Sequence, residues 1–252
     1  MKQTLRTAFA TLTAAAALTG AGLAQAGTIE TPPADPPVVR PAPQVANWAG
    51  FYGGLSYGKG KGTVKWEDRN GGWYTFAPGS KLSQDSDAGG FGAQMGYNWQ
   101  TSSNLVFGVE LSGMALSLET NENSKFFPGT DRLGTSIDRP IALTGKIGYA
   151  TGRWLPYAEA GFAIAQVGID NVDSFCVPKC IFRSDERHNG YVLGAGLSYK
   201  VSQRSSVGIN YRHYDFGTVR HKGRASNINT AEAYDTRARM GVVSVVWNYH
   251  FN

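Results

Sequence analysis

Four charged residues are the first candidates for chemistry in this chain: Glu110, Lys146, Glu159 and Arg212. Each lies in a segment where apolar and polar residues alternate, and each falls on the polar side. Alternate residues of a strand share one face, so a closed sheet would gather all four in its interior. Buried charges must be paired because an unpaired one is costly. We favour a salt-bridge network that fills a narrow barrel over a charged constriction for small ions.

Cys176 and Cys180 are a second candidate pair, in the stretch Cys-Val-Pro-Lys-Cys. Two nearby cysteines in an oxidising compartment indicate a local disulfide. A zinc site would need further ligands, and His188 alone is a weak candidate for one. We therefore predict a disulfide, with no metal site and no cofactor.

Basic residues are a third feature. The stretch Gly58-Lys59-Gly60-Lys61-Gly62 lacks the spacing and the Ser or Thr of a phosphate-binding loop. It belongs with the other basic residues of the expected outer loops: Lys65, Arg69, Arg132, Arg220, Lys222, Arg224, Arg237 and Arg239. Two interpretations stay open, attraction to lipopolysaccharide phosphates and ordinary solvated charge.

The elements that must position these residues are clearest in the last stretch, Arg239–Phe251. One alternating set contains Gly241, Val243, Val245, Trp247, Tyr249 and Phe251, and the other set is mixed and partly polar. This period of two predicts a strand with two unlike faces. The aromatic residues gather at one end, as they do where a strand meets a membrane–water boundary.

Seven further segments show the same alternation: Trp48–Gly58, Ala88–Trp99, Asn104–Leu116, Arg139–Ala150, Trp154–Val167, Asn189–Tyr199 and Ser206–Phe216. Short connections (Thr101–Ser103, Thr151–Arg153, Val201–Ser205) alternate with long polar ones (Lys59–Asp87, Glu119–Asp138, Gly168–His188, Gly217–Thr236). Short periplasmic turns and long outer loops are typical of bacterial barrels. We predict an all-β fold, an eight-stranded antiparallel up-and-down transmembrane β-barrel. Its periplasmic aromatic girdle would contain Trp48, Phe51, Trp99, Tyr149, Tyr199, Trp247, Tyr249 and Phe251.

The N-terminal region indicates the compartment. Residues 1–26 combine a basic start at Lys2 and Arg6, an apolar run and a small-residue cleavage site at Ala24-Gln25-Ala26, which predicts a secretory signal. Residues 27–46 form a proline-rich periplasmic linker, and 47–252 the barrel. Loss of Lys2 and Arg6 lowers the formal net charge from +5 to +3, which is too mild to indicate nucleic acid.

Three motifs together resemble a known family. They are Asn47–Gly58 (NWAGFYGGLSYG), Tyr211–Gly217 (YRHYDFG) and Trp247–Phe251 (WNYHF). They are similar to the porin-like small outer-membrane barrels of Gram-negative bacteria, which include opacity-type proteins and barrels like that of outer-membrane protein A. The resemblance implies an outer-membrane location, periplasmic chaperones and the barrel assembly machinery as partners, and a plugging charge network. Family members end on an aromatic residue, whereas Asn252 follows Phe251 here.

Barrels of this size also include lipid A deacylases, which resemble Arg-His-x-Ser in the corresponding region. Here Arg212-His213-Tyr214-Asp215 has aspartate in place of the serine nucleophile that acyl transfer needs. We therefore expect no enzyme, and expect His213 and Tyr214 to lie in the outer interfacial belt. The predicted function is a structural surface protein that contributes to envelope integrity, with outer loops for surface contacts. The alternatives are a narrow porin for small solutes or ions, a lipid A-modifying hydrolase and a ligand-binding adhesin.

Overall fold

The structure is a computed structural model, and it describes residues 45–70, 77–226 and 231–251. The expected signal at 1–26, residues 27–44 of the expected linker and the final Asn252 lie outside the described residues. The chain divides into two units, Met1–Pro41 and Ala42–Asn252, and every described residue belongs to the second.

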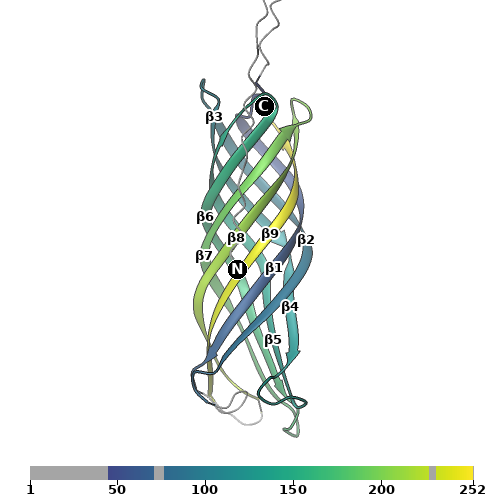
Figure 1. The fold of residues 1–252 in the computed structure, drawn as a ribbon, viewed down its shortest axis with the longest axis vertical. Helices are drawn as coiled ribbons and strands as arrows, with labels where there is room; N and C mark the ends of the chain where they lie inside the picture. The colour runs from purple at the N-terminus through teal and green to yellow at the C-terminus, as the bar shows by residue number, and fades with distance from the viewer. Residues whose placement is uncertain (1–44, 71–76, 227–230, 252) are drawn as a thin grey trace, which may run out of the picture. The chain divides into compact units, whose positions relative to one another are not determined.

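In the described residues, nine antiparallel strands form one sheet that closes on itself (Figure 1). In chain order they are β1 Gly50–Asp68, β2 Lys81–Gln100, β3 Leu105–Ala115, β4 Ser117–Asn123, β5 Asp131–Tyr149, β6 Trp154–Asp173, β7 Cys180–Lys200, β8 Ser205–Arg224 and β9 Ala231–His250. Their order in the sheet is β3-β2-β1-β9-β8-β7-β6-β5-β4, and pairing of β3 with β5 completes the ring. In the described part of the chain, no helix is long and apolar enough to cross a membrane.

β3 and β4 occupy one position in this ring, because both pair with β5. The interruption lies opposite Arg139 and Pro140, where the register of β5 shifts. Proline has no N–H to give to a neighbouring strand, and Arg139 has a positive φ of 46°. The barrel therefore has eight strand positions, one of them interrupted. The predicted all-β, eight-stranded antiparallel barrel is confirmed.

The prediction of long outer loops is wrong. β1 and β2 stay paired from Gly50 and Asn98 out to Glu67 and Lys81, and β5 to β9 extend equally far. The reason is that these segments still alternate. Val64, Trp66 and Leu82 point inward and are buried, while their chain neighbours are polar and either exposed or half-buried. A segment can be polar on average and still bury every second side chain.

The interior is filled in layers, which can be followed along the inward residues of β9. From the C-terminal end they include His250, Ser244, Met240, Thr236 and Tyr234, all buried. His250 adjoins a small cluster at the short-turn end, formed by Trp48, Val106, Ala150 and Leu155. Further along come a large apolar layer that includes Leu118, Ile137, Phe216 and Met240, and an outer apolar layer of Trp66, Leu82, Leu133, Ile169, Phe182, Ala225 and Tyr234.

The outside carries exposed apolar side chains over only half of the strand length. On β1 they are Phe51, Leu55 and Tyr57, and we call the whole set the apolar band. It also includes Phe91, Met95, Trp99, Phe107, Val109, Leu111, Ile141, Leu143, Ile147, Tyr149, Phe162, Tyr191, Leu193, Leu197, Val207, Ile209, Tyr211, Val243, Val245 and Trp247. Exposed apolar side chains on this scale indicate contact with lipid rather than water. The strands continue beyond the band with polar outward residues, and we call that part the outer extension.

Candidate functional site

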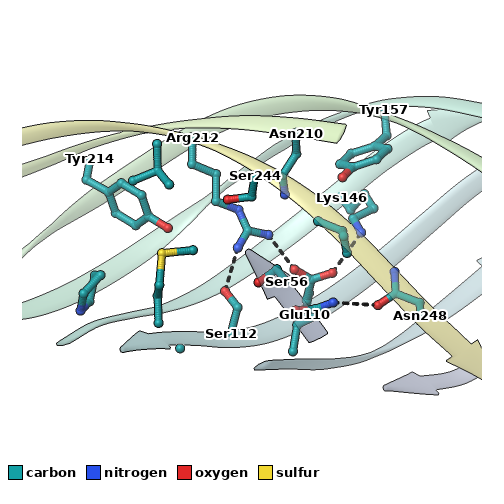
Figure 2. A pocket seen from close by; sticks show the side chains of 16 residues that line it. Ser56, Glu110, Ser112, Lys146, Tyr157, Asn210, Arg212, Tyr214, Ser244 and Asn248 are labelled. Carbon is teal, nitrogen blue, oxygen red and sulfur yellow. Dashed lines mark hydrogen bonds and ion pairs between the residues drawn. The ribbon is translucent and has the colours of Figure 1, made fainter. Parts of the chain in front are cut away.

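The four sequence-predicted charges lie together inside the barrel at the level of the apolar band. Arg212 on β8 donates from Nε to Glu159 Oε1 at 2.8 Å and from Nη2 to Glu159 Oε2 at 2.8 Å. The same Nη2 lies 2.5 Å from Glu110 Oε1. Lys146 Nζ lies 3.0 Å from Glu110 Oε2. Two cations and two carboxylates thus form one continuous network across the lumen. Figure 2 shows the part of it that joins Arg212, Glu110 and Lys146.

Neutral side chains complete the network. Tyr52 donates its hydroxyl to Glu110 Oε2 at 2.7 Å, and Thr144 donates to Glu159 Oε2 at 3.3 Å. Arg212 Nη1 donates to Ser112 Oγ at 2.8 Å. The ammonium of Lys146 also sits 4.4 Å from the centre of the Tyr157 ring, which is cation–π distance. The strand periodicity turns these residues inward, but it does not indicate that they would meet the charges.

Glycines on intervening strands make these contacts possible. Glu159 pairs with Gly194, and Gly194 pairs with Arg212. A Cβ at Gly194 would lie 2.9 Å from Glu159 Oε1 and 3.0 Å from its Cγ. The two side chains therefore meet over β7 only because position 194 carries none.

The same arrangement occurs on β2. Tyr52 on β1 pairs with Gly96, which pairs with Glu110 on β3. A Cβ at Gly96 would lie 2.5 Å from the Tyr52 hydroxyl, where no real Cβ could fit. The signal in the sequence is an inward-facing glycine. Only the register between strands shows which two side chains, one on each neighbouring strand, can meet across it.

The network is almost completely removed from water. The side chains of Lys146, Glu110, Arg212 and Glu159 are 7%, 5%, 11% and 0% exposed. In such surroundings the loss of one partner leaves an uncompensated charge, which typically costs about 3–5 kcal/mol. The two positive and two negative charges of the network balance, and each of them lies within bonding distance of a partner of opposite charge.

Little space remains beside it. The cavity lined by Glu110, Lys146, Arg212, Tyr214 and neighbouring side chains has a volume of about 20 Å³ (Figure 2). That volume accommodates about one water molecule. Within the described ranges, no group of three or more His, Cys, Asp or Glu is placed to hold a metal ion.

The apolar layers close the lumen on both sides of the network. Toward the short turns, Trp48 is 1% exposed, and its backbone N–H donates to Gln100 Oε1 at 2.7 Å. Toward the outer extension, Leu118, Ile137 and Phe216 are each 0% exposed. Apolar side chains are thus packed in the lumen on both sides of the charges.

The family model described as "Outer membrane protein beta-barrel domain" matches residues 10–251. The chain belongs to this family. As a member of it, the protein resides in the outer membrane of a Gram-negative bacterium. The short-turn end then faces the periplasm and the outer extension faces outward.

The family's relatives support the same placement. The 25 kDa outer-membrane immunogenic protein of Brucella abortus biovar 1 (strain 9-941) is 27% identical over 222 residues, which cover 86% of this chain and 88% of the relative. The 22 kDa outer membrane protein of Rhizobium leguminosarum bv. viciae is 28% identical over 182 residues, covering 70% of this chain and 68% of the relative. The crystal structure of OprG from Pseudomonas aeruginosa has a similar fold. Its TM-score is 0.52 at 12% identity, covering 81% of this chain and 97% of that one.

Most residues of the predicted aromatic girdle lie outside the barrel near its periplasmic end. Phe51, Trp99, Tyr149, Trp247 and Phe251 are exposed. Tyr199 and Tyr249 are half-buried against aromatic neighbours.

Trp48 is a correction to the predicted girdle. It precedes β1 and turns into the barrel mouth, where it packs with Val106, Ala150 and Leu155. Trp48 is an even number of residues from inward-facing Tyr52, so the period of two is consistent with its inward position. The girdle prediction placed it outside because it is an aromatic residue at the start of the strand. Trp154 takes an exposed place at this rim instead.

The remaining candidates lie outside the lumen network. Cys176 and Cys180 form a disulfide between β6 and β7 with Cα atoms 5.5 Å apart. His213 faces outward and is half-buried. Tyr214 does not lie in the outer belt, because it shares the inward register of Arg212 and is 6% exposed. Asp215 accepts hydrogen bonds from Arg237 and Arg239.

The outer extension holds a histidine pair that the sequence gave no reason to join. His188 on β7 and His221 on β8 are both 0% exposed, and their Nε2 atoms lie 3.1 Å apart. Burial, with the neighbouring His221 adding to it, lowers the pKa of His188 to about 4. Burial likewise lowers the pKa of His221. One neutral ring must donate to the other, so the pair acts as an uncharged cross-link between two apolar layers.

Proposed function

We propose that this protein is a sealed structural barrel that contributes to the integrity of the outer membrane. Its lumen serves as a packed core rather than a pore. The charge network and apolar layers hold eight strand positions rigidly against each other. The outer extension then carries short connecting tips well beyond the lipid.

One observation carries this proposal: the side chain of Arg212 spans the lumen and is held by carboxylates on two other strands. It contacts Glu159 at 2.8 Å and Glu110 at 2.5 Å. A conducting path would have to break these contacts and also displace the apolar layers. Both changes carry the cost of exposing buried charge or opening packed side chains.

The absence of an enzymatic function is part of the same proposal. His213 would be the general base of a hydrolase, but Asp215 stands where that activity needs a nucleophile. Asp215 is moreover bound by two arginines, with Nη2 of Arg237 at 2.7 Å and Nε of Arg239 at 2.9 Å. Its position supports a structural ion pair.

Surface contacts are assigned to the tips of the outer extension. At the β6–β7 tip, Phe175 is 83% exposed and Val177 is 97% exposed, and the disulfide spans this tip. The Brucella relatives are named as immunogenic proteins, which fits exposure of such tips at the surface.

Single-channel recording in planar bilayers tests the sealed lumen. Purified full-length protein, shown to be folded by its heat-dependent gel mobility, should give no conductance steps above those of a boiled sample. Reproducible steps from the folded protein would instead establish a porin. Envelope integrity has its own readout. A strain without the protein should gain sensitivity to detergent, and an unchanged strain would contradict that role.

A further inference from the structure

β7 and β8 stop pairing with each other at the start of the outer extension. Within the described residues, their ladder ends at the pair Tyr191 and Asp215, although both strands continue outward. A positive φ of 67° at Gly217 and a shift in the register of β8 against β9 mark this point. We call the facing stretches beyond it, residues 182–189 of β7 and 218–224 of β8, the seam. Side chains there must replace the backbone hydrogen bonds that join neighbouring strands elsewhere in the wall.

The two edges of the seam are joined at both ends. At the outer end, Ser226 donates its N–H to the carbonyl oxygen of Ile181 at 2.9 Å. At the inner end, His188 of β7 and His221 of β8 meet in the lumen with their Nε2 atoms 3.1 Å apart. Both histidines are 0% exposed. The histidine pair is therefore a buried contact that links β7 to β8 where their ladder is missing.

Three potential metal-ligand atoms meet at this pair. Besides the two Nε2 atoms, Thr236 Oγ1 of β9 lies 3.4 Å from Nε2 of His188. A zinc ion bound to two imidazoles at about 2.0–2.1 Å in tetrahedral geometry holds their nitrogens about 3.3–3.4 Å apart. The separation of 3.1 Å between the two Nε2 atoms is within about 0.3 Å of that spacing. An ion could therefore replace the hydrogen bond with only a small movement of the rings.

Both rings are in the charge state that a metal ligand requires. Burial lowers the pKa of His188 to about 4, and it also lowers the pKa of His221. The rings are therefore neutral at neutral pH, and no proton competes with the metal for them. The proton that one Nε2 donates within the pair would move to Nδ1 of the same ring, because that tautomer leaves Nε2 free to bind.

Glu186 supplies negative charge beside the pair. It lies on β7 two residues from His188, hence on the same face, and is half-buried. Its charge acts on His221, and within the described ranges it forms no ion pair. The nearby Arg187 and Arg220 are exposed on the outward face. A buried dication needs a compensating anion, and Glu186 is placed to provide it.

We propose that His188 and His221 bind a divalent transition metal ion of the zinc class, which fastens the seam between β7 and β8. The two Nε2 atoms would be its protein ligands, with Thr236 Oγ1 or water in the remaining positions. Imidazole nitrogen suits zinc, copper and nickel, whereas magnesium and calcium prefer oxygen ligands. Two histidines are fewer protein ligands than a structural zinc site has, so we expect the ion to exchange. The proposal does not depend on whether the lumen conducts.

The test uses full-length protein without a polyhistidine tag, folded in detergent and freed of metal by a chelator. Titration with Zn²⁺ should show saturable binding of a single ion per chain. His188→Gln and His221→Gln should each weaken binding at least about 100-fold, the upper end of what loss of an outer-shell partner costs. His213→Gln and His250→Gln are the matched controls, because they remove histidines outside the seam. Both controls should bind Zn²⁺ as wild type does.

Hydrogen exchange provides a second readout that a folding defect of a variant cannot imitate. At free Zn²⁺ about 100 times its Kd, openings of the wild-type seam that release the ion should become about 100-fold rarer. Exchange at residues 182–189 and 218–224 should slow accordingly, and should not respond to Zn²⁺ in His188→Gln. The proposal is overturned if wild type binds no Zn²⁺, if the controls lose binding as the pair variants do, or if bound Zn²⁺ leaves exchange in the seam unchanged. Heat-dependent gel mobility verifies that each variant is folded.

Discussion

Replacement of Gly194 by alanine tests whether glycine on β7 is what allows the lumen network to form. The added Cβ would lie 2.9 Å from Glu159 Oε1, 3.0 Å from Glu159 Cγ and 2.8 Å from the carbonyl oxygen of Tyr211. The backbone carbonyl cannot move without disturbing the pairing of β7 with β8. The carboxylate of Glu159 must therefore shift away from Arg212.

The expected cost follows from two limits. Overpacking alone typically destabilises a core by about 1–3 kcal/mol. Full separation of Glu159 from Arg212 would leave unpaired buried charges, which by itself costs about 3–5 kcal/mol. We expect Gly194→Ala to lower the free energy of unfolding by at least about 2 kcal/mol, a value that lies between the cost of mild overpacking and that of a fully broken pair.

Urea titration in lipid vesicles, followed by heat-dependent gel mobility, measures this free energy. Gly145→Ala is the matched control, since a Cβ there meets only one atom, at 3.8 Å. It should leave stability within about 0.5 kcal/mol of wild type, as surface substitutions usually do. If both glycine variants unfold at the same urea concentration, the glycine does not position the network and the reasoning fails.

The other predictions concern single layers of the interior. Arg212→Met should lower the unfolding free energy by about 3–5 kcal/mol, and Arg212→Met combined with Glu159→Gln should recover part of it, because fewer unpaired charges remain. Failure of the double variant to recover any stability in urea titrations would contradict the pairing. Trp48→Ala should cost about 3–5 kcal/mol by emptying the mouth, yet still give no conductance steps, since the outer apolar layers persist. Because the pKa of His188 is lowered to about 4, its contribution to stability is present above its unfolded pKa and is lost as pH falls from about 6.5 toward 4. Hydrogen exchange in the outer extension should accelerate over that window, and His188→Asn should flatten the response. The pKa of Glu232 is raised by burial to about 7, so its contribution has the opposite sign and declines as pH rises from about 4.5 to 7. Glu232→Gln should abolish that loss of stability, which is measured as an acceleration of hydrogen exchange at β9.

The barrel itself was predictable because lipid and lumen impose opposite demands on neighbouring residues. In Arg239–Phe251 the lipid-facing positions form an apolar set and the lumen-facing positions form a mixed, partly polar set. The same alternation turned Glu110, Lys146, Glu159 and Arg212 inward, as the structure has them. Local periodicity is sufficient for such statements, since it needs no knowledge of which strands are neighbours.

The outer extension was missed because its outward face meets water. Around Lys59-Gly60-Lys61-Gly62 the inward positions are glycines and the outward ones lysines, so no apolar signal marks a strand. The structure shows Gly60 close to Leu116 and Gly62 close to Leu118, which belong to the β3–β4 position on the far side of β2. These glycines make room for large side chains that come from elsewhere in the chain. The interior is filled there by partners distant in sequence.

The sequence by itself determined the class of fold, the membrane as its surroundings and the side of each strand that holds charge. Only the tertiary structure decided which charges touch and that the missing side chain at Gly194 lets Glu159 reach Arg212. It also decided that Trp48 packs in the barrel mouth and that His188 contacts His221. The physical reason is that the side of the sheet to which a side chain points depends on its position within its own strand. Which other side chains it contacts depends on the register between strands. Register is set by the closure of the whole ring.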